Sequence, residues 1–294
     1  MQASQPLYPT HYSKGFALVL LSAFCYGLQP FFAYFAYAAG ADPIGLLLAR
    51  FSLAAVVMLL WLKQRGIRLP APRLFGQTLL IGIGYAGAAV GYYSASHSTS
   101  VSLAVILMFS FPAFVTLFSM LFLNEQASWQ SLLSLLLASG GVMLATGMDF
   151  QGDTTGILWG LFAAVSYGSA ILYGTHTVAP QNPLASATVI LIGCALTLAI
   201  TGLLQDIRWP HSVDGWVAIL GLALFATILP IATFISGAPH IGASNASTLS
   251  TLEPIVAVTI AVILINESLT LAMLGGGTLV VIAALLLATQ KRRR

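Results

Sequence analysis

Residues 15–32, GFALVLLSAFCYGLQPFF, recur 141 positions later as residues 156–173, GILWGLFAAVSYGSAILY, with the pair Tyr-Gly in register. A second landmark recurs at almost the same spacing, because Pro112 and Pro254 are each followed twelve positions later by Asn-Glu. Self-similarity at a fixed spacing indicates an internal duplication. The chain is therefore predicted to contain two related halves.

The composition of the chain indicates a membrane protein. Apolar residues make up 58% of the 294 residues, charged residues only 6%, and the mean hydropathy is +0.93, which excludes a soluble globular domain. The apolar runs are continuous and longer than a barrel strand of about ten residues, so the spans should be helices of about 20 residues. Ten spans are expected, at residues 15–37, 43–62, 74–94, 99–121, 129–147, 156–176, 184–203, 213–236, 243–264 and 271–289.

The number of spans in each half decides how the two halves are related. Five spans in each half make the second half cross the membrane in the opposite sense to the first, an arrangement typical of transporters. The predicted fold is an all-α integral membrane protein with ten transmembrane helices in two inverted five-helix repeats. Its expected parts are an N-terminal tail at 1–14, a first repeat at 15–147, a second repeat at 156–290 and a basic tail at 291–294.

The basic residues predict which side of the membrane each loop occupies. If the spans alternate, almost all loop and tail cations fall on one side, which the positive-inside rule makes cytoplasmic. These cations are Lys14, Lys63, Arg65, Arg68, Arg73 and Lys291 to Arg294. Both termini are therefore expected inside. Orientation accounts for the isoelectric point near 9.0 without a nucleic-acid partner, although the terminal KRRR could also attract anionic lipid.

Glycines within the predicted spans favour helix packing rather than cofactor binding. The pattern Gly-x-Gly-x-x-Gly at residues 82–87 lies inside a span, whereas a dinucleotide site requires it between a strand and a helix. Gly87 and Gly91 instead offer a small-residue face for close helix contact, as do Gly140-Gly141 and residues 275–277.

No residue pattern indicates catalysis. No Cys/His cluster has metal-ligand spacing, no two carboxylates share a span, and no serine sits in a nucleophile elbow. Cys25 and Cys194 lie within spans and are expected to pack as small apolar side chains. We therefore expect no enzyme, no metal and no cofactor.

Glu253 is the one acid predicted deep within a span, where an ionised side chain costs at least a few kcal/mol unless it finds water or a partner. It could exchange a proton coupled to substrate, hold a cationic group, or make a structural hydrogen bond or ion pair, and we favour a functional role. Pro254 should break the helix beside it and free the carbonyl of Ser250. A polar stripe runs along the same span, mostly on another face: Ser244, Ser247, Thr248 and Thr251.

Arg50 is the only basic residue well inside a predicted span, about 10 Å past the start of span two. A buried guanidinium needs a counterion, backbone carbonyls or an anionic substrate group. Asp42 and Glu253 are its possible acidic partners. We favour structural pairing over substrate binding and leave the choice of partner open.

Span one and span six carry matching polar faces. Pro30 in span one frees the carbonyl of Tyr26, and Pro112 should likewise kink span four. A polar face inside lipid must contact protein or water, and matched faces about a pseudo-two-fold axis predict a binding site near the midplane. The residues concerned are Ser22, Tyr26, Gln29 and Tyr37 in span one and Ser166, Tyr167, Ser169 and Tyr173 in span six. With Tyr85, Tyr92, Tyr93 and Trp159 also available, such a cavity could stack an aromatic substrate or enclose a cation, although aromatic residues near span ends more often form the interfacial belt.

Four matched residue pairs mark span boundaries. Asp42-Pro43 and Asn182-Pro183 open spans two and seven, with each proline in the first helical turn. Asn124-Glu125 and Asn266-Glu267 precede spans five and ten, where asparagine can cap the next helix and glutamate can meet its positive end.

Several of these motifs together resemble the EamA-type transporters of the drug/metabolite transporter superfamily, over essentially the whole chain. In the first half the resemblance rests on Tyr26-Gly27, DPIGLLLARF at Asp42–Phe51, Pro112, and LNE ending at Glu125. In the second half it rests on Tyr167-Gly168, LEPIVAV at Leu252–Val258, INE ending at Glu267, and the glycine-rich start of span ten. The halves differ in two places, because span seven has no arginine matching Arg50 and Phe111 stands where the second half has Glu253.

The resemblance implies a central cavity, alternating access and a small-molecule substrate, without selecting that substrate or an oligomeric state. We expect a secondary transporter in the bacterial inner membrane that exports amino acids or related metabolites, with protons as a candidate coupling ion. A passive facilitator or a multidrug or cation exporter of the same fold is the alternative. A membrane scaffold or lipid-handling protein is a remoter one.

The orientation can be tested with a reporter fused after Arg294. We expect a fluorescent protein fused there to fluoresce and a fused alkaline phosphatase to be inactive, because the basic loops hold both termini inside. An active phosphatase fusion would contradict the predicted topology.

Overall fold

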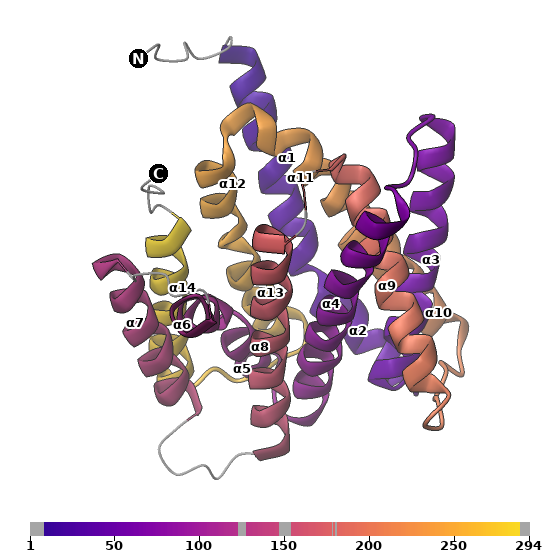
Figure 1. The fold of residues 1–294 in the computed structure, drawn as a ribbon. Helices are drawn as coiled ribbons and strands as arrows, with labels where there is room; N and C mark the ends of the chain where they lie inside the picture. Colours follow the sequence, from indigo (N-terminus) through magenta and orange to yellow (C-terminus); the bar gives the residue numbers. More distant parts are fainter. Residues whose placement is uncertain (1–8, 123–127, 147–153, 178, 180, 289–294) are drawn as a thin grey trace, which may run out of the picture.

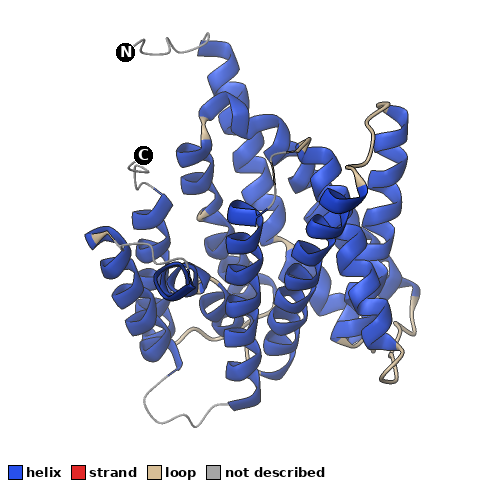
Figure 2. Ribbon diagram, in the orientation of Figure 1, coloured by secondary structure: helices blue, strands red, loops and turns tan. Residues whose placement is uncertain are grey.

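The computed structural model describes residues 9–122, 128–146, 154–177, 179 and 181–288. Within these ranges the chain forms helices and short connections and contains no strand (Figures 1 and 2). The prediction of an all-α protein is confirmed for this part of the chain.

The first half contains α1 (Pro9–Gly27), α2 (Gln29–Ala38), α3 (Pro43–Gln64), α4 (Pro72–Ser98), α5 (Val101–Met108), α6 (Phe111–Phe122) and α7 (Trp129–Thr146). The second half contains α8 (Thr154–Thr177), α9 (Pro183–Gly202), α10 (Val213–Ala223), the π-helix η1 (Leu224–Ile228), α11 (Leu229–Ile241), α12 (Ala243–Ser250), α13 (Leu252–Leu264) and α14 (Leu271–Ala288).

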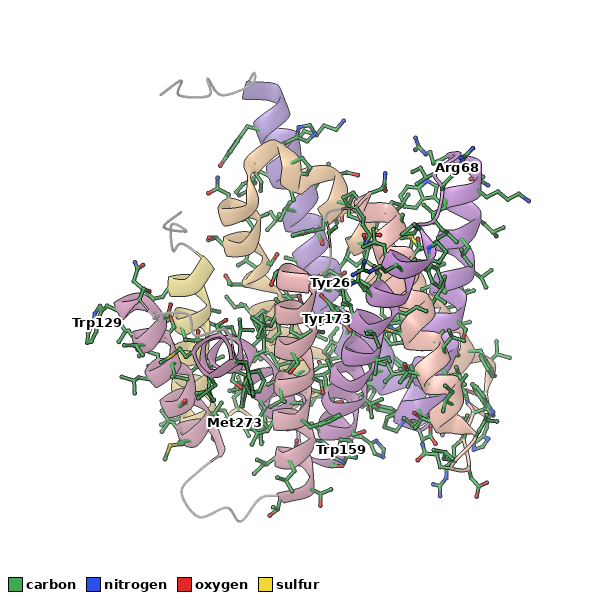
Figure 3. The ribbon with its side chains drawn as sticks, in the orientation of Figure 1. Tyr26, Arg68, Trp129, Trp159, Tyr173 and Met273 are labelled. Carbon is green, nitrogen blue, oxygen red and sulfur yellow. The ribbon has the colours of Figure 1, made fainter. Side chains whose placement is uncertain are left out.

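Seven helical segments of the described chain are long and apolar enough to cross a membrane: Tyr12–Ala38, Pro43–Gln64, Pro72–Ser98, Val101–Phe122, Thr154–Thr175, Pro183–Gly202 and Val213–Ile241. Three shorter apolar helices, Trp129–Ala145, Thr248–Leu264 and Leu271–Leu286, lie at predicted spans five, nine and ten. The total of ten spans stays a prediction. The start of α1 and the end of α14 lie at the same end of the bundle in Figure 1, and Arg68 lies at that end in Figure 3.

Helices are interrupted beside the three prolines singled out above. The breaks fall at Leu28 before Pro30, at residues 109–110 before Pro112 and at Thr251 before Pro254. Proline lacks an N–H and clashes with the preceding turn, which explains these positions. A further irregularity, the π-helix η1, ends two residues before a fourth proline in span eight.

The two halves use equivalent helix contacts. Helix α1 packs on α11 and α13, as α8 packs on α4 and α6, and α7 packs against α14. A Cβ atom added to Gly27 would lie 3.1 Å from the carbonyl oxygen of Glu253, and one added to Gly168 would lie 3.3 Å from that of Phe111. Matched glycines therefore let matched helices approach, as a duplicated chain requires.

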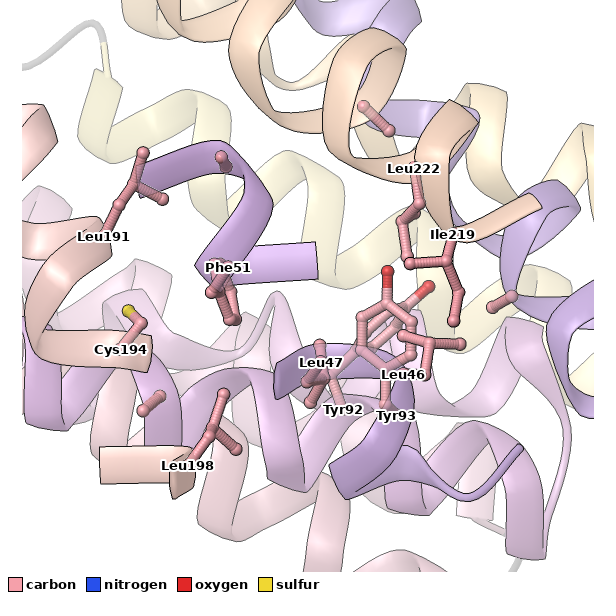
Figure 4. Close-up of a cluster of buried hydrophobic side chains, with 14 of the residues drawn as sticks. Leu46, Leu47, Phe51, Tyr92, Tyr93, Leu191, Cys194, Leu198, Ile219 and Leu222 are labelled. Atoms are coloured by element: carbon pink, nitrogen blue, oxygen red, sulfur yellow. The ribbon is translucent and has the colours of Figure 1, made fainter. Parts of the chain in front are cut away.

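The largest apolar core lies where α3 meets α4, α9 and α10 (Figure 4). Leu46, Leu47 and Tyr93 are almost fully buried there, and Cys194 of α9 is 1% exposed. Cys25 is also buried. The prediction that both cysteines pack as small apolar side chains is confirmed.

The predicted small-residue faces are confirmed except at Gly140, which has open space around it. Gly82 packs against Gly193 of α9, while Gly87 and Gly91 pack against α8. Gly141 of α7 contacts the backbone of α14 at Gly276. These contacts bring backbones together in a way that a larger side chain would prevent.

The capping predictions had mixed outcomes. Pro43 and Pro183 lie in the first turn of α3 and α9, so their predicted placement is confirmed. Asp42 accepts a hydrogen bond from the Gly45 N–H at 2.6 Å, and Asn182 accepts bonds from Leu184 and Ala185 at 3.0 and 3.3 Å, so both residues also cap their helices. The prediction for Asn266-Glu267 is wrong, because Thr270 caps α14. Asn124-Glu125 lies outside the described residues.

Glu267 instead caps a helix of the other half. Its carboxylate accepts hydrogen bonds from the backbone N–H groups of Val101 and Ser102, both at 3.1 Å, at the start of α5. Asn266 has a φ of +57° and turns the chain toward this contact. The glutamate meets a positive helix end, as expected, but one that is distant in sequence.

The close crossing of α7 and α14 yields a stability prediction with a neighbouring control. In Gly141→Ala the new Cβ would lie 2.6 Å from the Gly276 carbonyl oxygen, whereas Gly140 has open space around it. Overpacking of this kind costs about 1–3 kcal/mol, so Gly141→Ala should lower the thermal midpoint by several degrees. Gly140→Ala should leave it unchanged or raise it. Equal shifts of the midpoint in the two variants would contradict the packing.

Candidate functional site

Glu253 lies in the first turn of α13, directly after the break at Thr251. Its side chain is half-buried, and no hydrogen-bond donor of the described residues contacts its carboxylate. It interacts electrostatically with Arg50 and with a group of tyrosines: Tyr26, Tyr92, Tyr93 and Tyr167. A carboxylate without a direct partner among tyrosine hydroxyls is available for a proton or a cationic group.

Arg50 is held by groups other than a carboxylate. It is 4% exposed, and its Nε donates to Thr227 Oγ1 at 2.7 Å, its Nη1 to the Tyr93 hydroxyl at 2.8 Å and its Nη2 to the Ala226 carbonyl at 3.2 Å. Its guanidinium carbon lies 4.9 Å from the centroid of the Phe51 ring. Of the partner types expected for Arg50, the structure supplies a backbone carbonyl. Two hydroxyl groups accept its other hydrogen bonds.

Asp42 is committed to the backbone at the end of the bundle. Besides capping α3, its Oδ2 accepts from the Arg208 N–H at 3.0 Å, and its own N–H donates to the Arg208 carbonyl at 3.1 Å. These bonds join the connection before α3 to the one before α10. Asp42 makes no ion pair with Arg50 in the described structure.

Two polar residues of span one connect α1 and α2 to other helices. The Ser22 hydroxyl is buried and donates to the Pro230 carbonyl of α11 at 2.8 Å. The Gln29 side chain accepts from the Tyr93 hydroxyl at 3.2 Å, beside the break at Leu28. Tyr26 is half-buried and lies midway along the bundle in Figure 3. Of these three, Ser22 is committed to helix packing.

Tyr167 is the span-six residue that belongs to the group of tyrosines around Glu253. Its ring lies edge-on to Phe111 at 4.7 Å and to Tyr85 at 5.1 Å between centroids. Since Phe111 stands where the second half has Glu253, Tyr167 beside Phe111 is the counterpart of Tyr26, whose neighbour Gly27 packs against the backbone of Glu253. The duplication thus places one aromatic ring and one carboxyl group in equivalent positions.

The other span-six candidates lie farther from this centre. Ser166 packs against Gly87 of α4, and Tyr173 is half-buried. Ser169 is exposed, because it lies about 200° around the helix from Tyr167 at 100° per residue. The structure therefore does not bring Ser169 together with Tyr167 or Glu253.

The hydroxyls of span nine are used within their own helix. Ser250 donates to the Ala246 carbonyl at 3.0 Å, and Thr251 donates to the Thr248 carbonyl at 2.7 Å, next to the break before Pro254. Thr248 is half-buried. The side chains of Ser244 and Ser247 lie outside the described part. These bonds stabilise the helix end that precedes Glu253.

Two cavities approach the centre from opposite ends of α4. Cavity A, about 260 Å³, is lined by Pro30, Ala33, Tyr34, Tyr37, Tyr92, Ser96, Thr99, Ser100, Val101, Ile265 and Glu267. Cavity B, about 380 Å³, is lined by Thr78, Ile81, Tyr85, Ala170, Ile171, Gly174, Thr175, Ala179, Gln181, Ser186 and Ile190. Tyr92, which lines cavity A, and Tyr85, which lines cavity B, are seven residues apart on one face of α4, about 10 Å along its axis.

The described residues contain no group of three or more His, Cys, Asp or Glu side chains that could hold a metal ion. The chemistry offered by the centre is hydrogen bonding, charge and aromatic contact. These are the interactions that bind and release a solute.

Residue-by-residue reading of the sequence missed Thr227 and Pro230. Pro230 offered a signal, because a proline in the middle of predicted span eight should free a carbonyl four residues earlier, that of Ala226. Thr227 carried no comparable signal. Its role depends on helices that meet only in the folded protein.

The two cavities predict thiol accessibility from opposite sides of the membrane. In a background with Cys25 and Cys194 replaced by alanine, Ser96→Cys in cavity A and Ser186→Cys in cavity B provide single reporters. A membrane-impermeant maleimide should label one in right-side-out vesicles and the other in inverted vesicles. The unmodified protein, whose two native cysteines are buried, serves as the unreactive control. Labelling of both reporters from one side would contradict the geometry.

Comparisons with known proteins agree with this architecture. The EamA-like transporter family model matches residues 13–147 and again residues 154–289. The uncharacterized inner membrane transporter YedA of Escherichia coli is 25% identical over 246 residues, covering 81% of this chain and 79% of that protein. The uncharacterized transporter YcbK of Bacillus subtilis is 24% identical over 283 residues, covering 90% and 89%.

A crystal structure with 18% sequence identity has the same fold, with a TM-score of 0.59 over 96% of this chain and 97% of that one. The two family matches together cover nearly the whole sequence, one in each half. The chain belongs to the EamA-like transporter family.

Proposed function

We propose that this protein is a secondary transporter that exports amino acids or related small metabolites across the bacterial inner membrane by alternating access. In this proposal ten helices form two inverted repeats, residues 15–147 and 156–290, with both termini in the cytoplasm. The membership of a transporter family and the multi-pass helical fold are its foundation.

The observation that carries the proposal is the pair of cavities at opposite ends of α4. Tyr92 lines cavity A and Tyr85 lines cavity B, and the ring of Tyr167 contacts the rings of both Tyr85 and Phe111. A solute at the centre would reach either side once the matching set of helices moved. Two such sets are α1 with α11 and α8 with α4, which make equivalent contacts in the two halves.

Glu253 is the residue proposed to bind the proton or the amino group of the substrate. It follows a helix break, lacks a direct partner in the described structure and lies in the charge field of Arg50 and Tyr26. A carboxylate that is neutral on one side of the cycle and charged on the other couples solute movement to protons.

A cation exporter is the second candidate, favoured by the same surroundings. Tyrosine faces and a single carboxylate are the groups that enclose an organic cation. Because Arg50 is buried and hydrogen-bonded, its guanidinium is not available to bind a substrate carboxylate. A passive facilitator differs from both candidates only in lacking proton dependence.

The proposal is tested with Glu253→Gln and the matched control Asp214→Asn, which neutralises an exposed acid at the start of α10. Everted vesicles are offered labelled amino acids and a labelled quaternary ammonium, with and without a proton gradient. We expect Glu253→Gln to lower the gradient-dependent rate by about tenfold or more, because a charged partner is lost. Asp214→Asn should transport normally.

Proton dependence that survives Glu253→Gln undiminished would remove the coupling role. Transport of the ammonium but of no amino acid would select the cation exporter. If folded protein moved no solute at all, the transporter proposal would fail in favour of a scaffold or lipid-handling role.

A further inference from the structure

Arg50 and Pro230 both break the symmetry of the repeat, and they lie close together in the fold. Helix α9, which matches α3, contains no arginine, and α4, which matches span eight, contains no proline after Pro72. Arg50 and Pro230 therefore each lack a counterpart in the other half. In the folded protein these two unmatched residues meet at the same turn of span eight.

The chemical link between them is a freed carbonyl. The backbone before Pro230 is π-helical, because the Leu229 N–H donates to the Leu224 carbonyl five residues earlier. In the α-helical register the Ala226 carbonyl would accept from the N–H of residue 230, which proline lacks. Arg50 Nη2 donates to this carbonyl at 3.2 Å, while Arg50 Nε donates to Thr227 Oγ1, which in turn donates to the Leu222 carbonyl at 3.0 Å. Away from water, such a carbonyl must find a donor within the protein.

The same guanidinium reaches the break in span one. Its Nη1 donates to the Tyr93 hydroxyl at 2.8 Å, and that hydroxyl donates to Gln29 Oε1 at 3.2 Å, one residue past the break at Leu28. The Ser22 hydroxyl, on the other side of the break, donates to the Pro230 carbonyl. Two discontinuous helices are thus connected through one side chain.

We propose that Arg50 is a positioning residue, not a substrate ligand: it stabilises the π-helix η1 before Pro230 and links it to the break between α1 and α2. The transport part of this inference, that the two breaks move together, rests on the proposed function. The structural part does not. Arg50 is 4% exposed, and its Nε, Nη1 and Nη2 atoms all donate hydrogen bonds to protein groups.

The test is a double-mutant cycle between Arg50→Gln and Pro230→Ala, read by hydrogen–deuterium exchange in lipid nanodiscs. Arg50→Gln should speed amide exchange in residues 222–231 by about tenfold or more, because the charged donor is lost. Pro230→Ala restores an N–H for the Ala226 carbonyl, so in the double variant the added effect of Arg50→Gln should be about threefold or less. Arg208→Gln, which changes an exposed loop arginine, is the control.

Arg50→Lys provides a second route if Arg50→Gln does not fold. It keeps the charge but not the planar fork, so residues 222–231 should still exchange faster than in the unmodified protein, and Pro230→Ala should reduce that difference. Rescue of exchange without any measured transport would support the positioning role even where the proposed function fails.

Unchanged exchange in both Arg50 variants would overturn the inference. It would also be overturned if Arg50→Gln raised the KM for a transported solute while the Pro230→Ala background gave no rescue. That pattern belongs to a substrate ligand, because a ligand's contribution does not depend on the backbone of span eight.

Discussion

Backbone hydrogen bonding at interrupted helices is the constraint on which the centre of this protein depends. Proline breaks fall beside Leu28, Ser110 and Thr251, and each leaves groups that lipid cannot satisfy. At Thr251 and Ser110 the nearby hydroxyls bond to carbonyls of their own helix. In span eight no such local donor reaches the Ala226 carbonyl, and the donor comes from Arg50.

The internal duplication provides the frame around that centre. Matched glycines, Gly27 and Gly168, meet matched carbonyls of Glu253 and Phe111, so the two halves pack by the same rule. The chemistry is nevertheless unequal, because one half supplies a carboxyl group where the other supplies a ring. A solute crossing such a site would meet the carboxyl group of Glu253 in one half and the ring of Phe111 in the other. This inequality is compatible with a symmetric frame, since the matched contacts are made by glycines and backbone carbonyls.

Several predictions from sequence held because they concern neighbours along the chain. Pro43 and Pro183 lie in the first turn of their helices, as the restricted backbone of proline predicts, and the small-residue face of α4 follows from helical spacing. Ser169 did not join the central group, because helical geometry turns it away from Tyr167. Glu267 caps a helix 165 residues away rather than the helix that follows it, and the spacing of residues along the chain does not predict this contact.

The sequence by itself determined the membrane environment, the helical class, the duplication and the positions of the helix breaks, because hydropathy, spacing and proline chemistry are local. Tertiary structure alone decided the partners of Arg50. Thr227 and Ala226 are 177 and 176 residues distant, and Tyr93 is 43 residues distant. A guanidinium accepts a carboxylate, a carbonyl or a hydroxyl as partner, so only the packing of α3 against α4 and η1 could select among them.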